Sequence, residues 1–552
     1  MTHYLKSISL PLLALLLSAC GTKDGLQFTV APTLEPNPNE AAPLAAVLTF
    51  EANQPVKTTI TISDGDRERV VKHGITQDPT KGLPLIGFSP NKSHQVSIRI
   101  EDAEGNVANS QPIAFTVPGL PAHPAEFPAI QVAKIDHSRA ESGYRLFNPR
   151  RRIPRETQLG NEEEMRFGES FGMLTMVDLE GNPIWYYQTG SRIAGFNYRE
   201  DGRIFYVTAD YHLVEIDLLG NVTRSWYAAD RPQGPSDATP VEALTFHHDA
   251  NLLDDGNILA LSTEKRLIPN YYTSEYDASA PRKDQWVMGD RLVEFTPNGE
   301  IIWEWNAFDY MPSRRIGYET FSTYWERRGF PGVIDWSHAN EITKLDDGNV
   351  LVNFRYQSAV LKIDTNTGEI IWIFGEPNGW PESLQSKLFR LEGDARWPWH
   401  QHAPQFTEQG TFVMFDNGNY RAHPFDAPTP VKDTWSRAIE YELDEENLVA
   451  RQIWTSEYPG HEKYVTIAMG NASVTPEKGN ILAGYGAILD PERVDEVDWE
   501  TRARIGQLTR CIEYTKTNPA EIVWELRLEP TGDDPKIGWV IFGCKSIKEL
   551  SF

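Results

Sequence analysis

Most of the chain alternates apolar and polar residues over short runs that pass through a Gly- or Asn-containing turn and end at a tryptophan. Such a run predicts a β-hairpin, because side chains two residues apart lie on the same face of a strand. The unit occurs six times, at Met173–Trp185, His212–Trp226, Arg291–Trp303, Ala359–Trp372, Ala438–Trp454 and Cys511–Trp524. Repetition of this kind is typical of an architecture in which each copy packs against the next.

A second hairpin pattern, with turns such as DDGN, precedes five of the six copies. It occurs at Asn197–Thr208, Ala250–Ser262, Ile342–Phe354, Gln405–Phe415 and Ser473–Tyr485. Two hairpins make a four-stranded sheet, which is the blade of a β-propeller. The first tryptophan hairpin lacks a clear leading hairpin, and the run Gly538–Ile547 lacks a trailing one. We therefore expect these two ends of the chain to share the sixth blade and close the ring.

The N-terminal part reads differently. Short β-rich runs bounded by Pro, Asn, Asp and Gly fill residues 27–118 and predict an immunoglobulin-like β-sandwich. The proline-rich run Pro118–Ile130 predicts a stiff linker, which we extend over residues 119–150. The predicted fold is thus all-β, with an immunoglobulin-like N-terminal sandwich followed by a six-bladed β-propeller over residues 151–552.

The first residues predict export. Lys6 precedes the apolar run LPLLALLLSAC, which is too short to span a bilayer comfortably. Leu17–Gly21 resembles the lipobox of bacterial lipoproteins, which implies a signal peptide over residues 1–19, lipidation of Cys20 and a tether over residues 20–26. Gly21 after the cysteine favours the periplasmic face of the outer membrane of a Gram-negative cell. A plain secretory peptide, leading to the periplasm, is the alternative.

Net charge indicates which partners to expect, and cysteine content indicates a disulfide. With 52 basic and 78 acidic residues the net charge is −26, so the surface repels nucleic acid and anionic membranes. We expect no nucleic-acid partner and membrane contact only through the lipid. Cys511 and Cys544, the other cysteines, predict one disulfide that would pin the ring shut. Two buried free thiols are the alternative.

Histidines stand at nearly the same place in three consecutive blades. His248, His338 and His402 lie eight, ten and eight residues before the turn glycines Gly256, Gly348 and Gly410. Because inner strands of a propeller surround a central channel, we expect these three imidazoles to converge. Arg355 follows on the far arm of the His338 hairpin. The adjacent His247 and His400 are expected to pack or to support the site.

These motifs resemble those of the bacterial aryl-sulfate sulfotransferases. The resemblance rests on HHDANLLDDGN, on DWSHANEI with FRYQS after it, and on WHQHAP with FDNGN after it. It covers nearly all of the chain after the signal peptide. It implies transfer of a sulfuryl group from a phenolic sulfate ester to another phenol, without a nucleotide donor, through a sulfated histidine. By the same resemblance the nucleophile is His402, with His248, His338 and Arg355 as further catalytic residues.

The residue types suit that reaction. Arg355 offers a fork of donors for the nonbridging oxygens, a neutral His402 can attack sulfur, and His248 or His338 can move the phenol proton. We expect no cofactor. The expected substrate-binding side chains near the channel are Trp336, Tyr356, Trp399 and Asn340. A hydroxyl residue in a later blade stays unassigned among Asn471, Ser473 and Thr475.

Other functions remain open at this level. The three histidines could bind zinc and leave a fourth position for water, although an arginine nearby would repel a cation. The chain could also be a non-catalytic propeller lipoprotein. It lacks a GxxxxGK[ST] loop and a C/S-x-P-x-R pattern, which disfavours nucleotide-donor sulfotransferases and sulfatases. The oligomeric state, a homodimer included, and the phenols used are not fixed. The insertion Asn306–Phe330 could line the entrance or join subunits.

Overall fold

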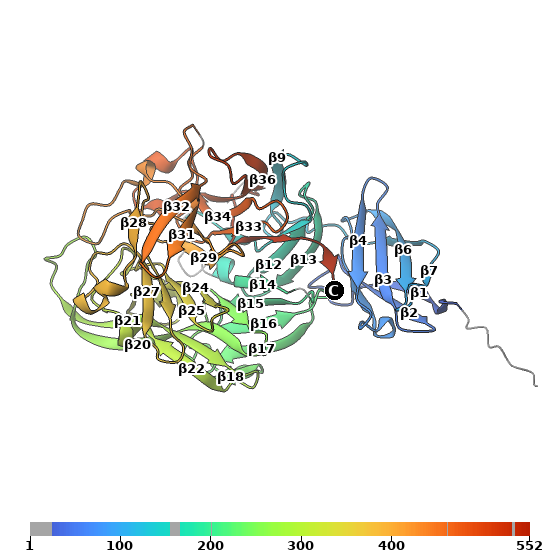
Figure 1. Cartoon of the computed structure of the whole chain (residues 1–552), viewed down its shortest axis with the longest axis horizontal. Helices are drawn as coiled ribbons and strands as arrows, with labels where there is room; N and C mark the ends of the chain where they lie inside the picture. The colour runs from blue at the N-terminus through green and yellow to red at the C-terminus, as the bar shows by residue number, and fades with distance from the viewer. Residues whose placement is uncertain (1–24, 155–165, 200, 461, 533–535) are drawn as a thin grey trace, which may run out of the picture.

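The computed structural model describes residues 25–154, 166–199, 201–460, 462–532 and 536–552. A small β-sandwich, drawn in blue, lies beside a large propeller, and the C-terminus is found between them (Figure 1). The expected signal peptide, lipidated Cys20 and most of the tether lie outside the described residues. Within the described ranges, no helix is both long and apolar enough to span a bilayer.

The sandwich consists of two sheets, as the β-rich pattern predicts. The smaller sheet holds β1 (Phe28–Pro36), β2 (Ala46–Ala52) and β5 (Leu83–Leu85). The larger sheet holds β3 (Lys57–Ser63), β4 (Glu68–His73), β6 (Ser93–Glu101), β7 (Val107–Asn109), β8 (Ile113–Thr116) and β39 (Leu550–Ser551). Alternate residues of β3, β4 and β6 are buried, which places one face of this sheet against the domain core.

Six sheets form the propeller, and each blade follows the predicted hairpin order. The second blade holds β14 (Ile193–Tyr198), β15 (Ile204–Thr208), β16 (His212–Ile216), β17 (Val222–Ala228) and β18 (Thr239–Val241). The third holds β19 (Ala250–Leu252), β20 (Ile258–Tyr271), β21 (Lys283–Phe295), β22 (Ile301–Asn306) and β23 (Val333–Asp335). The fourth holds β24 (Ala339–Lys344), β25 (Val350–Phe354), β26 (Ala359–Ile363) and β27 (Ile370–Gly375).

The fifth and sixth blades complete the series. The fifth holds β28 (Arg390–Glu392), β29 (His402–Phe406), β30 (Phe412–Asp416), β31 (Arg437–Asp444) and β32 (Val449–Thr455). The sixth holds β33 (Asn471–Val474), β34 (Ile481–Leu489), β35 (Gln507–Tyr514), β36 (Ile522–Glu529) and β9 (Ala129–Ile135). Helical segments are short: α2 (Ala307–Tyr310), η1 (Pro79–Lys81), η3 (Glu326–Arg328), η4 (Glu382–Lys387), η5 (Val431–Asp433), η6 (Val494–Glu496) and η7 (Arg502–Arg504).

The first blade joins distant parts of the chain. It holds β10 (Tyr144–Phe147), β12 (Gly172–Val177), β13 (Pro183–Thr189) and β38 (Cys544–Ile547). Because β38 pairs with β10, the C-terminal run and the first tryptophan hairpin share a blade, and the predicted ring closure is confirmed. A separate two-stranded ribbon pairs β11 (Arg150–Arg152) with β37 (Gly538–Val540).

Two expectations need correction. The stretch predicted as a linker, residues 119–150, contributes β9 to the sixth blade and β10 to the first, so most of it belongs to the propeller. Proline content misled here because the last proline of the proline-rich run is Pro128, directly before β9 begins. The predicted disulfide is not formed: Cys511 and Cys544 are free, fully buried thiols. Burial and the neighbouring Cys544 raise the pKa of the Cys511 thiol.

The tryptophan of each hairpin joins its blade to the next one. Five of the six donate the indole N–H to an oxygen of the following blade: Trp185 to Leu218, Trp226 to Pro297, Trp303 to Thr365, Trp372 to Glu445 and Trp524 to Leu179. The bond from Trp524 returns to the first blade. Trp454 is the exception, because its indole nitrogen has no partner among the described residues.

The sandwich is attached to the propeller at several points. The final strand β39 runs parallel to β4 inside the sandwich sheet. Arg69 of the sandwich forms a buried ion pair with Asp178 of the first blade, with 2.7 Å between Nη2 and Oδ2. The Gly87 N–H also donates to the Ile184 carbonyl at 3.2 Å. The C-terminal strand therefore packs into the N-terminal sandwich and forms a clasp between the sandwich and the propeller.

Candidate active site

A cavity of about 200 Å³ collects the histidines singled out in the sequence. His248, His338 and His402 all line it, and so does Arg355. These residues come from the third, fourth and fifth blades, so the predicted convergence of three blades is confirmed. The remaining wall is rich in arginine and tyrosine, which suits an anionic aromatic ligand.

The backbone at these positions is unusual. His248 and His338, just before β19 and β24, have φ values of 52°, and His400 has 53°. Left-handed backbone costs a residue with a side chain about 1–2 kcal/mol, and such strain is concentrated at functional sites. His402 instead is the first residue of β29. His400, rather than His402, thus shares the backbone conformation of the other two, although only the His402 ring reaches the cavity.

Hydrogen bonds fix which nitrogen of His402 carries the proton. Nδ1 lies 2.7 Å from Asn417 Oδ1 and 3.2 Å from the His400 carbonyl. Asn417 gives its own N–H groups to the Thr466 and Met469 carbonyls, which leaves its oxygen facing the ring. Nδ1 therefore donates, and Nε2 keeps its lone pair. The Met469 N–H donates to Nε2 at 3.2 Å.

His402 is neutral at physiological pH. Burial, with Arg355 adding a second unfavourable charge, lowers the pKa of His402 to about 3. Its side chain is almost entirely buried. A neutral imidazole that is unprotonated at Nε2 is the nucleophilic form of histidine.

His338 has a carboxylate behind it. Its Nδ1 donates to Asp335 Oδ2 at 2.5 Å, which leaves Nε2 for the cavity. Tyr356 stacks on the same imidazole, with 4.3 Å between ring centroids and 18° between planes. An imidazole backed by a carboxylate can hold a second proton as an ion pair, so His338 is suited to proton transfer.

His248 is backed by a second imidazole. His247 Nε2 donates to the Ser262 carbonyl at 3.1 Å, so its Nδ1 accepts from His248 Nδ1 at 2.9 Å. The Nε2 lone pair of His248 is then free. Burial, with the imidazoles of His338 and His247 nearby, holds the pKa of His248 well below its ordinary value. His248 and His338 lie 4.7 Å apart between ring centroids.

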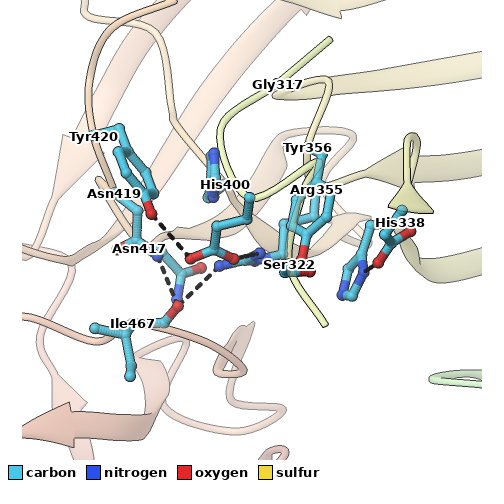
Figure 2. Close-up of polar contacts among 12 residues, drawn as sticks. Gly317, Ser322, His338, Arg355, Tyr356, His400, Asn417, Asn419, Tyr420 and Ile467 are labelled. Atoms are coloured by element: carbon cyan, nitrogen blue, oxygen red, sulfur yellow. Dashed lines mark hydrogen bonds and ion pairs between the residues drawn. The ribbon is translucent and has the colours of Figure 1, made fainter. Parts of the chain in front are cut away.

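Arg355 is held by its neighbours with one donor unused. Its Nη1 pairs with Glu319 Oε2 at 2.5 Å, and its Nη2 donates to the Ile467 carbonyl at 2.9 Å. Nε is buried and has no partner among the described residues. Figure 2 shows the side chains of Arg355, Tyr356 and His338 near one another, with Ile467 beyond the guanidinium. The site thus combines a fixed cation with three imidazoles.

Comparison with known proteins identifies the family of the chain. A family described as arylsulfotransferase matches residues 148–528, and one described as arylsulfotransferase Ig-like domain matches residues 33–118. The chain belongs to the arylsulfotransferase family. The resemblance read from the histidine motifs is therefore confirmed.

Two curated members of the family align with part of the chain. Arylsulfate sulfotransferase AssT of Escherichia coli O6:H1 is 25% identical over an alignment 395 residues long, and the alignment covers 59% of this chain and 61% of that protein. Arylsulfate sulfotransferase AssT of Lelliottia amnigena is 27% identical, and that alignment also covers 59% of this chain and 61% of the relative. The alignment thus spans less than two thirds of either relative.

Solved structures give only remote matches. A protein of unknown function from Bacteroides caccae covers 72% of this chain and 99% of its own, at 13% identity and a TM-score of 0.36. Virginiamycin B lyase from Staphylococcus aureus covers 80% of this chain and 94% of its own, at 12% identity and a TM-score of 0.27. Scores this low support no conclusion about function.

Of the four side chains expected to bind substrate, one lines the histidine cavity and three do not. Tyr356 lines the cavity as predicted. Trp336 packs instead in the core, stacked on Phe308 and bonded to the Arg315 carbonyl. Asn340 is fully buried and bonds Gln401 and Asn353. Trp399 lies against His423, away from the histidine cavity.

The arrangement also bears on the zinc alternative. Among the residues that the structure describes, no group of three or more His, Cys, Asp or Glu side chains could hold a metal ion. Tyr324 and Tyr356 pack against these imidazoles, and arginines line the same cavity. This donor set favours an anion over a cation.

Sequence reasoning missed several residues of the site. The insertion Asn306–Phe330 supplies Glu319, Tyr324, Arg327 and Arg328 to the cavity, so part of it lines the site. Gly317 allows this approach, because a Cβ there would lie 1.7 Å from the Tyr356 carbonyl oxygen. Asn417, within the FDNGN motif, is a further site residue that the sequence pattern did not predict. Its place one strand after His402 was the available signal.

Proposed function

We propose that the protein is an aryl-sulfate sulfotransferase that moves a sulfuryl group from a phenolic sulfate ester to another phenol. The observation that carries the proposal is His402, a buried neutral imidazole with its Nε2 lone pair in a cavity beside Arg355. The family membership agrees with this activity. Phenolic sulfate donor and phenol acceptor are accordingly the proposed substrates.

In the first half-reaction Nε2 of His402 attacks sulfur. An N–S bond forms while the S–O(aryl) bond breaks, and the departing phenolate takes a proton from His338. Charge on the three nonbridging oxygens is balanced by Arg355, whose unpartnered Nε is available. The Met469 N–H, which shares the Nε2 lone pair in the free enzyme, is then positioned to donate to a sulfuryl oxygen.

The second half-reaction reverses the first. The incoming phenol places its oxygen where the phenolate departed and gives its proton to His338, while neutral His248 accepts a hydrogen bond at Nε2. The phenol oxygen attacks sulfur, the N–S bond breaks, and His402 is restored. Because the same cavity serves both steps, donor and acceptor occupy one aryl site in turn.

Kinetics test this proposal. With 4-nitrophenyl sulfate as donor and phenol as acceptor, we expect parallel double-reciprocal lines, insensitivity to chelator, and complete loss of transfer in His402→Ala with the fold retained. Turnover that requires both substrates bound together would contradict the covalent route. Chelator-sensitive hydrolysis would indicate a metal site, and no turnover with any aryl sulfate would indicate a non-catalytic propeller.

We also propose that the protein is a lipoprotein held through Cys20 at the periplasmic face of the outer membrane. The support is the lipobox-like LSAC-Gly sequence at Leu17–Gly21. Fractionation of the native host should place the wild-type protein with outer-membrane lipoproteins. Cys20→Ser should abolish acyl labelling; unchanged labelling would contradict the proposal.

A further inference from the structure

Arg150 lies in the wall of the same cavity and is not used by the proposed reaction. It is the first residue of β11, paired with Val540 of β37, and its side chain is 5% exposed. Its Nη1 donates only to the Met469 sulfur, a weak acceptor, at 3.1 Å. Its Nε and Nη2 have no partner among the described residues. A buried guanidinium with two unused donors is costly unless something binds it.

Among the residues that the structure describes, no carboxylate forms an ion pair with Arg150. Two glutamates line the cavity, and each already serves two arginines. Glu169 pairs with Arg192 and Arg328, whereas Glu319 pairs with Arg355 and Arg502. Burial, together with the charges of Arg192 and Arg152, lowers the pKa of the Arg150 side chain. The cavity wall therefore carries more positive charge than its own carboxylates balance.

Arg150 and Arg355 are surrounded by different charged groups. The charge of Arg355 acts on His402, the proposed point of attack. The charged and titratable groups that act on Arg150 are Arg192, Arg152, Glu169 and Tyr324. The Arg150 guanidinium also lies over the Phe542 ring, at 5.2 Å from its centroid, and that ring neighbours His248. A sulfuryl group bound at Arg355 therefore leaves Arg150 for a second anionic group.

Resting on the proposed function, we infer that Arg150 is the centre of an anion subsite that selects phenols carrying a second anionic group, such as a carboxylate or a sulfonate. The Nε and Nη2 donors form the fork that such a planar or tetrahedral group accepts. The Phe542 ring packs against the Arg150 guanidinium. Because donor and acceptor use one aryl site in turn, the subsite acts on both.

The test compares neutral and anionic acceptors in two arginine variants. Acceptors are phenol, 4-hydroxybenzoate and 4-hydroxybenzenesulfonate, with 4-nitrophenyl sulfate as donor. In Arg150→Met we expect kcat/KM to fall about 10- to 100-fold for the anionic acceptors and less than about threefold for phenol, the loss typical of one charged hydrogen-bonded contact. The two anionic arms show whether carboxylate or sulfonate is preferred.

Arg151→Met is the matched control. Arg151 lines the same cavity on the same strand, but its guanidinium bonds the Phe167 and Ala125 carbonyls. Removing that charge should leave the ratio of anionic to neutral acceptors within about threefold of wild type, well short of the loss of a charged contact. Equal changes of this ratio in both variants would overturn the inference, because general charge would then explain them.

Stability separates recognition from a structural role. Arg150→Met removes an unsatisfied buried cation, so its Tm should not fall below that of the wild type. Millimolar 4-hydroxybenzoate should raise the Tm of the wild type and not of Arg150→Met, and neutral 4-hydroxybenzyl alcohol should not discriminate. A lowered Tm with equal losses for all acceptors would overturn the inference. Wild-type protein with no turnover would refute the proposed function, while the 4-hydroxybenzoate shift still tests the subsite.

Discussion

The reactivity of His402 depends on one amide. Asn417 accepts from Nδ1 at 2.7 Å, and its own N–H groups are held by two carbonyls, so the side chain cannot turn to present nitrogen to the ring. The remaining acceptor at Nδ1 is the His400 carbonyl at 3.2 Å. Asn417 is thus the group that keeps the lone pair at Nε2, where sulfur arrives.

Removing that amide should slow both half-reactions. In Asn417→Ala the imidazole loses its main acceptor, and we expect kcat to fall about 10- to 100-fold, the effect of losing about 1.4–2.7 kcal/mol of transition-state stabilisation. Single-turnover release of 4-nitrophenol measures it. Asn419→Ala is the control. Among the described residues, the Asn419 side chain donates a hydrogen bond only to the Ile467 carbonyl. A loss in both variants of equal size would contradict the tautomer role.

The lowered pKa of His402 links the site to stability. The folded pKa is about 3 and the ordinary value is 6.5. Above pH 6.5 neither state binds the proton, and the stability is complete. As pH falls from 6.5 towards 3, the unfolded chain takes up a proton that the folded chain refuses, so stability is lost. As the pH falls, proton uptake by His402 in the unfolded chain therefore destabilises the fold before His402 in the folded protein is protonated.

A pair of variants measures this effect. The free energy of unfolding of His402→Gln, relative to that of the wild type, should be about 2 kcal/mol higher at pH 5 than at pH 8. This follows because pH 5 lies about 1.5 units below the ordinary pKa of 6.5. Chemical denaturation at the two pH values is the measurement. His137→Gln serves as control, since His137 is exposed. A pH-independent difference for His402→Gln would show that the imidazole is not held neutral by the fold.

At the scale of the element, the tryptophan hairpin is the unit that repeats. In five blades the N–H of the hairpin tryptophan bonds an oxygen of the next blade. The hydrophobic pattern predicted the hairpins, because alternation and turn residues are local properties of the chain. It did not predict the bonds between blades, because the accepting oxygens are set by how two sheets pack.

The exception at Trp454 allows a matched test. Trp226→Phe removes the bond to the Pro297 carbonyl and should lower stability by about 1–3 kcal/mol, the cost of leaving a buried polar group unpaired. Trp454→Phe changes the same ring where the indole nitrogen has no described partner, so it should cost less. Midpoints of denaturation compare the two. A larger loss at Trp454 would contradict the role given to the inter-blade bond.

The loops show where sequence reasoning stops. His248, His338 and His402 could be found because each precedes a recognisable turn in its blade. Glu319 and Arg150 could not, since the first lies in an insertion and the second in a segment expected to be a linker. The prediction that Trp336 contacts the substrate failed for a related reason. A tryptophan beside a histidine looks like an aromatic platform, but its indole N–H is bonded inside the core.

At the scale of the whole molecule, the C-terminal strand joins the N-terminal sandwich to the propeller. The last strand β39 pairs with β4, the Phe552 N–H donates to the Lys72 carbonyl, and the Gly74 N–H donates to the Phe552 carbonyl. None of these residues lines the histidine cavity. The clasp between sandwich and propeller is therefore separate from the site.

Deleting residues 550–552 tests that separation. We expect a lower Tm and faster proteolysis of the sandwich, because the buried Leu550 and the two backbone bonds are lost. Initial rates of sulfuryl transfer at a temperature well below the transition should stay within about twofold, since the cavity is untouched. Loss of transfer in a variant that is still folded would mean that the sandwich positions the site.

The central claim is that the sulfuryl group passes through His402. The most direct measurement is mass spectrometry of the enzyme mixed with excess 4-nitrophenyl sulfate in the absence of acceptor and quenched in alkali, which preserves an N–S bond. The account predicts one sulfuryl group on the peptide that contains His402, a burst of 4-nitrophenol equal to the enzyme, and disappearance of the adduct when phenol is added. Transfer that proceeds in wild type with no adduct on His402, or with the adduct on another residue, would contradict it.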